Sequence, residues 1–185
     1  MPLPCCLWYS VLMEKKEKYP KRKRNRLPRF DYSTPGAYFI TICAHEHKCV
    51  FSRVQVSEPV GDGLARPVVI LTNLGHIVEQ QIAAIPNRFP TVSVDAYVIM
   101  PNHIHLLLSL HQDAGRASPS PTVGNIVGTL KSLSVRAAKP YLGDKPLFQR
   151  SYYDHVIRGE RDYSETWAYM DGNPGRWAED ELFAQ

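Results

Sequence analysis

One stretch in the middle of the chain restricts the fold more than any other. Two strand-like runs, Val92–Met100 and His103–Leu110, are separated only by a Pro-Asn turn, which predicts two neighbouring strands. Side chains alternate between the two faces of a sheet, so His103 and His105 lie on one face and Ile104 lies with its apolar neighbours on the other. The sequence therefore predicts a strand with one face toward a core and two imidazoles on the opposite face.

Further strand patterns precede this pair. The run Ala37–Ala44 is rich in aromatic and β-branched residues and follows a Ser-Thr-Pro-Gly turn signal, so it is predicted as a first strand. Residues 50–71 contain more strand-like runs around a Gly61-Asp62-Gly63 turn, with Val68–Leu71 the clearest. They suggest a hairpin.

Three segments have helical spacing of apolar residues. The first begins at a cap, Thr72 or Asn73, and ends at prolines 86 and 90; the second spans Val123–Lys139 and stops at Pro140. The third runs from about residue 161 to 172, before an Asn-Pro pair that disfavours further helix. Strands and helices in this order predict an α+β fold, a mainly antiparallel sheet with helices packed on it.

Length and composition fit one domain. The chain has 185 residues, of which 44% are apolar, enough to bury a sizeable core. A membrane span needs about 20 consecutive apolar residues, which the sequence lacks, so a soluble, cytoplasmic protein with no membrane partner is expected. Residues 1–12 have no basic residues before their apolar run, so they are not expected to be a signal peptide; translation from Met13 is the hypothesis.

The positive charge is concentrated near the start. Nine basic residues stand against two acidic ones between Glu14 and Arg29, an excess of seven in a chain whose net charge is +4. Such a run is either a solvated segment or a phosphate-binding arm. We therefore predict a flexible basic arm over residues 1–28 and a catalytic domain over 29–185. The arm residues expected to contact DNA are Lys21, Arg22, Lys23, Arg24 and Arg26.

The cysteines do not form a zinc pattern, because no CxxC occurs. Cys43 and Cys49 flank His45 and His47, and this cluster could hold a metal. A strand that runs into a turn, with reduced thiols, explains the same residues, and it is the preferred interpretation.

The histidine pair by itself is a weak signal, since two histidines on a strand can be surface or hydrogen-bonded residues. Two imidazoles on one face can also share a cation. A metallohydrolase of the HxHxDH kind needs Asp and His where this chain has Leu107 and Leu108, and a site of three alternating histidines needs His at Leu107. Both interpretations fail, so a metal at His103 and His105 needs a third ligand from elsewhere.

The last helical segment offers that ligand. Tyr169 and Asn173 are four residues apart and share one helix face, so they can enter one site together. Asn173 brings a carbonyl oxygen and Tyr169 a phenol that can act as a nucleophile. Core packing beside Trp167 and Met170 is the alternative for the tyrosine.

Together these segments resemble a known family, the REP-associated tyrosine transposases, which belong to the HUH single-tyrosine transposases. The resemblance covers nearly the whole chain from Arg26 to Asp180. Its motifs are RLPRFDYSTPGAYFITI (26–42), VIMPNHIHLLL (98–108), Lys131-Ser132, QRSYYDHVIRGERDY (149–163) and YMDGNPGRW (169–177).

The resemblance implies a ferredoxin-like sheet faced by a helix that delivers a tyrosine. It assigns His103 and His105 as metal ligands, Tyr169 as the nucleophile and Asn173 as the third ligand within Y-x-x-x-N-P. The chain departs from the family pattern at positions 171 and 172, where it has Asp and Gly, and this puts in doubt the stability of the helix there.

Other residues of the motifs are expected to compete with or support these four. Tyr152 and Tyr153 compete with Tyr169 as nucleophiles, but only Tyr169 is spaced four residues from a metal ligand. Lys131 and Arg158 are expected to contact DNA. Residues 153–155 are expected to support the structure or to contact DNA.

The implied activity is metal-dependent cleavage and rejoining of single-stranded or hairpin DNA through a 5′-phosphotyrosine link. A phenol with a pKa of about 10 needs help at neutral pH, and a Mg²⁺ or Mn²⁺ ion on the two imidazoles and one amide oxygen would activate the phosphate.

Two rival functions are weighed. In a relaxase-type replication initiator the tyrosine precedes the histidines, whereas Tyr169 follows His105 by 64 residues. A catalytically idle binding module could instead stack bases on sheet aromatics such as Tyr38 and Phe39; the presence of all four site residues argues against it. The oligomeric state stays open, since the family includes both homodimers that exchange tyrosine helices and forms that act alone.

Overall fold

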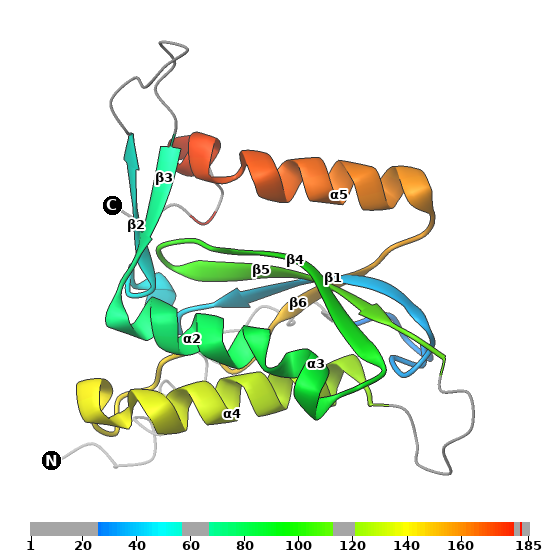
Figure 1. Cartoon of the computed structure of the whole chain (residues 1–185), viewed down its shortest axis with the longest axis horizontal. Coiled ribbons are helices and arrows are strands. Elements are labelled where there is room, and N and C mark those ends of the chain that lie inside the picture. Colours follow the sequence, from blue (N-terminus) through cyan, green and yellow to red (C-terminus); the bar gives the residue numbers. More distant parts are fainter. Residues whose placement is uncertain (1–25, 57–66, 113–120, 180–181, 183–185) are drawn as a thin grey trace, which may run out of the picture.

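A four-stranded antiparallel sheet forms the centre of the molecule (Figure 1). The computed structural model describes residues 26–56, 67–112, 121–179 and 182. The strands lie in the order β4-β5-β1-β6, with β1 at Gly36–Cys43, β4 at Val92–Ile99, β5 at His103–Leu110 and β6 at Tyr153–Val156.

Helices cover both faces of this sheet. Helices α2 (Asn73–Ala83) and α4 (Val123–Leu142) lie side by side on one face, and α5 (Glu160–Gly172) crosses the other face (Figure 1). Without α5, the order β1-α2-β4-β5-α4-β6 is the βαββαβ arrangement of a ferredoxin-like fold. The predicted α+β fold with a mainly antiparallel sheet is confirmed.

The remaining elements are short. Strands β2 (Ser52–Val56) and β3 (Pro67–Leu71) pair as the predicted hairpin, whose Gly61-Asp62-Gly63 turn lies outside the described residues. The short helices are η1 (His45–His47), α3 (Ile85–Arg88) and η2 (Pro174–Glu179).

The core lies between the sheet and the pair α2 and α4. Ile104, Leu106 and Leu108 of β5 are fully buried in it. The apolar face of α4 packs there with Val123, Ile126, Val127 and Leu130. The predicted alternation along β5 is therefore confirmed, because its odd-numbered residues are left for the face under α5.

Two helix ends differ from the sequence prediction. The prediction that Pro140 stops the second helix is wrong, since α4 continues to Leu142. A proline in the last turn removes a single backbone hydrogen bond, and the Gly143 N–H still donates to the Lys139 carbonyl at 2.8 Å. Likewise, α2 ends at Ala83 and Pro86 lies in the first turn of α3, where a proline is well tolerated.

The cap of α2 is as predicted. Thr72 precedes the helix with an extended backbone, and its Oγ1 accepts a hydrogen bond from the Gly75 N–H at 3.1 Å. Strand β6, at the edge of the sheet beside β1, was not predicted from the sequence pattern.

Among the described residues, no helix is long and apolar enough to cross a membrane.

Candidate active site under α5

The two histidines lie at the centre of the face under α5. Both are buried, with His103 at 0% and His105 at 3% exposure, and their ring centroids are 4.5 Å apart. They come from the start of β5, where Cys43↔His103 and Thr41↔His105 are the register partners on β1. The strand alternation thus places both imidazoles together, as predicted.

Each imidazole is held through its Nδ1 atom. His105 Nδ1 lies 2.9 Å from Thr41 Oγ1, and His103 Nδ1 lies 2.8 Å from Asn102 Oδ1. The Asn102 amide is itself oriented, because its Nδ2 donates to the Leu182 carbonyl. An amide oxygen only accepts, so His103 Nδ1 carries the proton and Nε2 keeps its lone pair.

His105 is a neutral base in this environment. Burial, together with the neighbouring His103, lowers the pKa of His105 to about 3. Its Nε2 is buried and makes no hydrogen bond with any described residue. The Thr41 hydroxyl can donate to Nδ1 or accept from it; in the tautomer with the proton on Nδ1, the Nε2 lone pair is available to bind a cation.

The predicted nucleophile lies beside this pair. The Tyr169 ring centroid is 5.4 Å from that of His105 and 6.0 Å from that of Phe39, both in edge contact, and the side chain is 40% exposed. The Phe39 ring in turn stacks on His105 at 5.0 Å. Tyr169 is therefore open to solvent on one side and packed against the histidine face on the other.

Asn173 ends α5 on the same side. It is the C-cap residue, and its side chain is 3% exposed. The short helix η2 follows directly after Asn173, and the ring centroid of Trp177 in η2 lies 5.9 Å from that of His103. The structure thus brings His103, His105 and Tyr169 together, and it buries Asn173 at the end of the same helix.

An amide ligand is essential to the predicted metal site. Among the described residues, no three His, Cys, Asp or Glu side chains gather closely enough to hold a metal ion. This applies equally to the alternative cluster of Cys43, Cys49, His45 and His47. A cation at the histidine pair therefore depends on an oxygen donor such as Asn173.

Arg176 is a further residue beside Tyr169, and it was not predicted from the sequence. Its guanidinium lies 5.9 Å from the Tyr169 ring centroid and packs against Gly172, where an added Cβ would meet Arg176 Nη2 at 3.2 Å. Gly172 thus lies directly against the Arg176 guanidinium, beside Tyr169. Arg176 stands three residues after Asn173 within the last motif, and that spacing was the available signal.

The rival tyrosines occupy different environments. Tyr152 is 8% exposed in the core on the α4 side, and burial raises its pKa. Its hydroxyl accepts a hydrogen bond from Arg26 Nη2. Tyr153 pairs with Thr41 and so shares the histidine face, with 53% exposure.

The residues expected to contact DNA are dispersed. Lys131 donates to the Gln149 and Ser151 carbonyls at 2.8 Å, and burial lowers its pKa to about 8. Arg158 is exposed in the linker before α5, and its backbone N–H donates to Asp162. Arg26 lies over the Tyr152 ring, while residues 21–24 lie outside the described part of the chain.

The fold and this arrangement define a ferredoxin-like sheet with a histidine pair facing a tyrosine helix. A solved structure of a REP-associated tyrosine transposase bound to a REP hairpin is similar, with a TM-score of 0.54 at 18% identity over 84% of this chain and 74% of that one. The predicted resemblance is confirmed at the level of the fold. A candidate transposase from Deinococcus radiodurans R1 aligns with a TM-score of 0.44 and 18% identity over 82% of this chain and 96% of its own.

Sequence comparison gives the family. A Haemophilus influenzae protein named only as uncharacterized is 31% identical over 177 residues, which cover 88% of this chain and 93% of its own length. The chain belongs to the same family as that protein. No family model matches the sequence.

Proposed function

We propose that this protein is a metal-dependent single-stranded DNA endonuclease and strand transferase, a transposase, that forms a 5′-phosphotyrosine intermediate. The observation that carries the proposal is the edge contact between the Tyr169 ring and the buried, neutral His105. A phenol beside a cation-binding imidazole pair is the arrangement that a tyrosine nucleophile needs. The similar solved structure, with its bound hairpin, suggests hairpin DNA as the substrate.

The donor set fits a divalent cation. His103 and His105 would supply imidazole nitrogens and Asn173 an amide oxygen, a mixed set that suits Mn²⁺ at least as well as Mg²⁺. His105 Nε2, buried without a hydrogen bond to the described residues, supports this fit. When bound, the ion would polarise the scissile phosphate and offset its developing charge.

Tyr169 performs the covalent step. The Tyr169 oxygen attacks the phosphorus as its proton passes to solvent water, a Tyr–O–P bond forms, and the bond from phosphorus to the 3′ oxygen breaks. The 3′ oxygen takes a proton and departs as a hydroxyl, and the 5′ side of the DNA stays on Tyr169. Attack by a second 3′ hydroxyl on this link reverses the chemistry and joins strands.

Arg176 supports the charge changes of this step. Its guanidinium lies 5.9 Å from the Tyr169 ring centroid, so it can attract an approaching phosphate. The basic arm before the domain would bind the DNA backbone outside the site.

A cleavage assay tests the proposal. Labelled single-stranded hairpins from the genomic neighbourhood are incubated with the purified chain and Mn²⁺, Mg²⁺ or chelator. We expect a metal-dependent cut and a denaturant-resistant protein-DNA adduct, both absent in Tyr169→Phe. Tyr153→Phe is the matched variant, an exposed tyrosine on the same sheet face, and it should still form the adduct.

Three other outcomes would contradict the proposal. An adduct that persists in Tyr169→Phe and disappears in Tyr153→Phe moves the nucleophile to β6. An adduct independent of metal removes the role of the histidines. Hairpin binding without cleavage under any condition indicates the catalytically idle binding module.

A further inference from the structure

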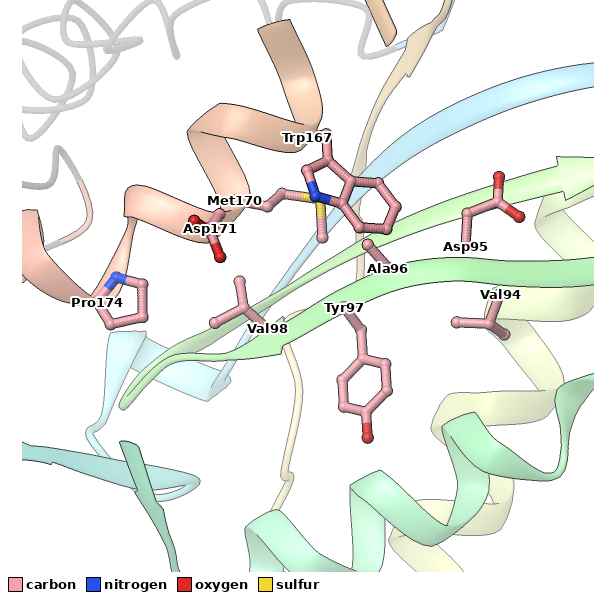
Figure 2. Close-up of a pocket in the computed structure, with 9 residues that line it drawn as sticks. All are labelled: Val94, Asp95, Ala96, Tyr97, Val98, Trp167, Met170, Asp171 and Pro174. Carbon is pink, nitrogen blue, oxygen red and sulfur yellow. The ribbon is translucent and has the colours of Figure 1, made fainter. Parts of the chain in front are cut away.

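A cavity of about 400 Å³ lies between α5 and the edge strand β4, next to the candidate site (Figure 2). Its volume is in the range of about 300–1,000 Å³ that small-molecule sites occupy. The α5 side is made by Trp167, Met170 and Asp171, and the floor by Ala96 and Val98 of β4. The function proposed above uses none of these side chains.

The cavity is one strand away from the histidines. Val98 is the register partner of His105, and neighbouring strands are about 4.8 Å apart. On α5, Trp167 and Met170 lie on either side of Tyr169 in sequence. A group that occupies the cavity is therefore close to any phosphate held between Tyr169 and His105.

One end of the cavity offers an aromatic surface. The Trp167 indole extends from α5 over Ala96, with the Met170 side chain beside it (Figure 2). Trp167 is 44% exposed although a large indole normally becomes buried. An exposed indole over a small side chain is a surface on which a planar base can stack.

The two carboxylates of the cavity differ in what they can bind. Asp95 already accepts hydrogen bonds from the Ser93, Ser109 and Tyr163 hydroxyls. Asp171 is exposed and makes no hydrogen bond or ion pair with the other described residues. Asp171 is thus the carboxylate available to a ligand.

A carboxylate selects against most of the groups that DNA presents. It accepts hydrogen bonds and donates none when ionised, so it repels phosphate and matches only base edges that carry N–H groups. Thymine offers one such group, whereas guanine offers two parallel ones on its Watson–Crick edge. Two parallel donors on a carboxylate form the stronger, bidentate kind of contact.

We propose that this cavity binds one unpaired DNA base that carries N–H donors, guanine in preference, stacked on Trp167 and hydrogen-bonded to Asp171. The position of the base next to the cleaved phosphate rests on the function proposed above. The cavity then recognises the base at the cleavage point. This recognition requires unpaired DNA, because base pairing covers the Watson–Crick edge.

Binding experiments test the cavity separately from the chemistry. The full chain carrying Tyr169→Phe, which cannot form an adduct, is titrated with fluorescein-labelled dT8 and with dT4-X-dT3, where X is G, A, C or inosine. We expect X = G to bind about 10-fold more tightly than T. Inosine lacks the exocyclic amine and should fall between them.

Variants assign the preference to the two side chains. Asp171→Asn should remove the preference for G, while Trp167→Leu should weaken binding of the G oligonucleotide about 10-fold and Trp167→Phe should restore most of it. Asp144→Asn is the matched control, since Asp144 is a 98% exposed carboxylate at the end of α4. Tyr97→Phe is a second control, because Tyr97 lines the cavity but its hydroxyl donates to Glu79 of α2, so the hydroxyl that this variant removes is already bonded outside the cavity.

Equal affinity for all five oligonucleotides, or a preference unchanged in Asp171→Asn, would overturn the proposal. Cleavage by the wild-type chain is measured in parallel. A base preference without an adduct supports the cavity and refutes the proposed function, whereas an adduct without a base preference does the reverse.

Discussion

The two faces of the central sheet are built differently. On one face, α4 buries six of its residues, and apolar side chains fill the space to the sheet. On the other face, α5 buries only Met170, and the sheet below it presents His103, His105 and Thr41. Apolar burial makes the first face the source of stability, while the second keeps polar groups under a lightly packed helix where chemistry can occur.

The difference extends to how α5 is held. Near its start, His155 Nε2 lies 3.0 Å from the Asp162 carboxylate, and the Tyr163 hydroxyl donates to Asp95 at 3.1 Å. These contacts are polar and partly exposed, unlike the core contacts of α4. A helix held in this way fixes the position of Tyr169 and still leaves its side chain 40% exposed.

The largest expected effect is on the core face. Leu106→Ala should lower the free energy of unfolding by about 2–5 kcal/mol, because it leaves a cavity in a fully buried position. His105→Leu, on the opposite side of the same strand, should lose metal binding yet keep or gain stability, since it removes a buried imidazole. Urea unfolding of the apo-protein measures both, and equal losses would show that the two faces are alike.

The second-largest effect is expected at low pH, where protonation of His105 under α5 should lower the stability of the fold. Because the pKa of folded His105 is about 3 and that of an unfolded histidine is about 6.5, the unfolded chain binds more protons between these values. Stability is therefore complete above pH 6.5 and falls as the pH drops toward 3, by a few kcal/mol. Unfolding of the wild-type apo-protein against pH, compared with His105→Leu, isolates this contribution; identical profiles would contradict it.

The residues that orient the imidazoles should have a smaller effect. Thr41→Val keeps the shape of the side chain and removes the hydroxyl 2.9 Å from His105 Nδ1. Mn²⁺ affinity should fall about 10–100-fold, as it does when partners of metal-bound histidines are lost. Calorimetric titration with Mn²⁺ measures this, and thermal unfolding checks that the fold is retained. Unchanged affinity would mean that ring orientation is set by packing alone.

The smallest effect is expected on the outer surface of α5. Arg161 and Glu165 form an exposed ion pair at 2.7 Å. Arg161→Ala should change the free energy of unfolding by no more than about 0.5 kcal/mol. A loss above about 1 kcal/mol in urea unfolding would show that α5 contributes more to stability than its exposure indicates.

The elements that could be predicted from the sequence are those in which apolar residues recur at a regular spacing. Alternation in β5 and helical spacing in α2 and α4 were sufficient for the core. The roles of Tyr169 and Asn173 came from the family resemblance and stay predictions. Strand β6 was not predicted, because Tyr153–Val156 lacks an apolar alternation. Its strand state comes from pairing with β1, a contact distant in sequence.

The supporting residues of the site were equally hard to foresee. Thr41 meets His105 across 64 positions, and Arg176 meets Tyr169 around a helix end. No local pattern encodes such pairings, which only the sheet register and the path of η2 create. The metal ligands, by contrast, were assigned from the family resemblance together with residue chemistry, and this assignment stays a prediction.

The register of β1 against β5 determines both the packing of the apolar core and the position of the two histidines. A slip of one position along β5 would turn both imidazoles into the apolar core and would expose isoleucine and leucine under α5. Such a chain would lose its stability and its site by the same error.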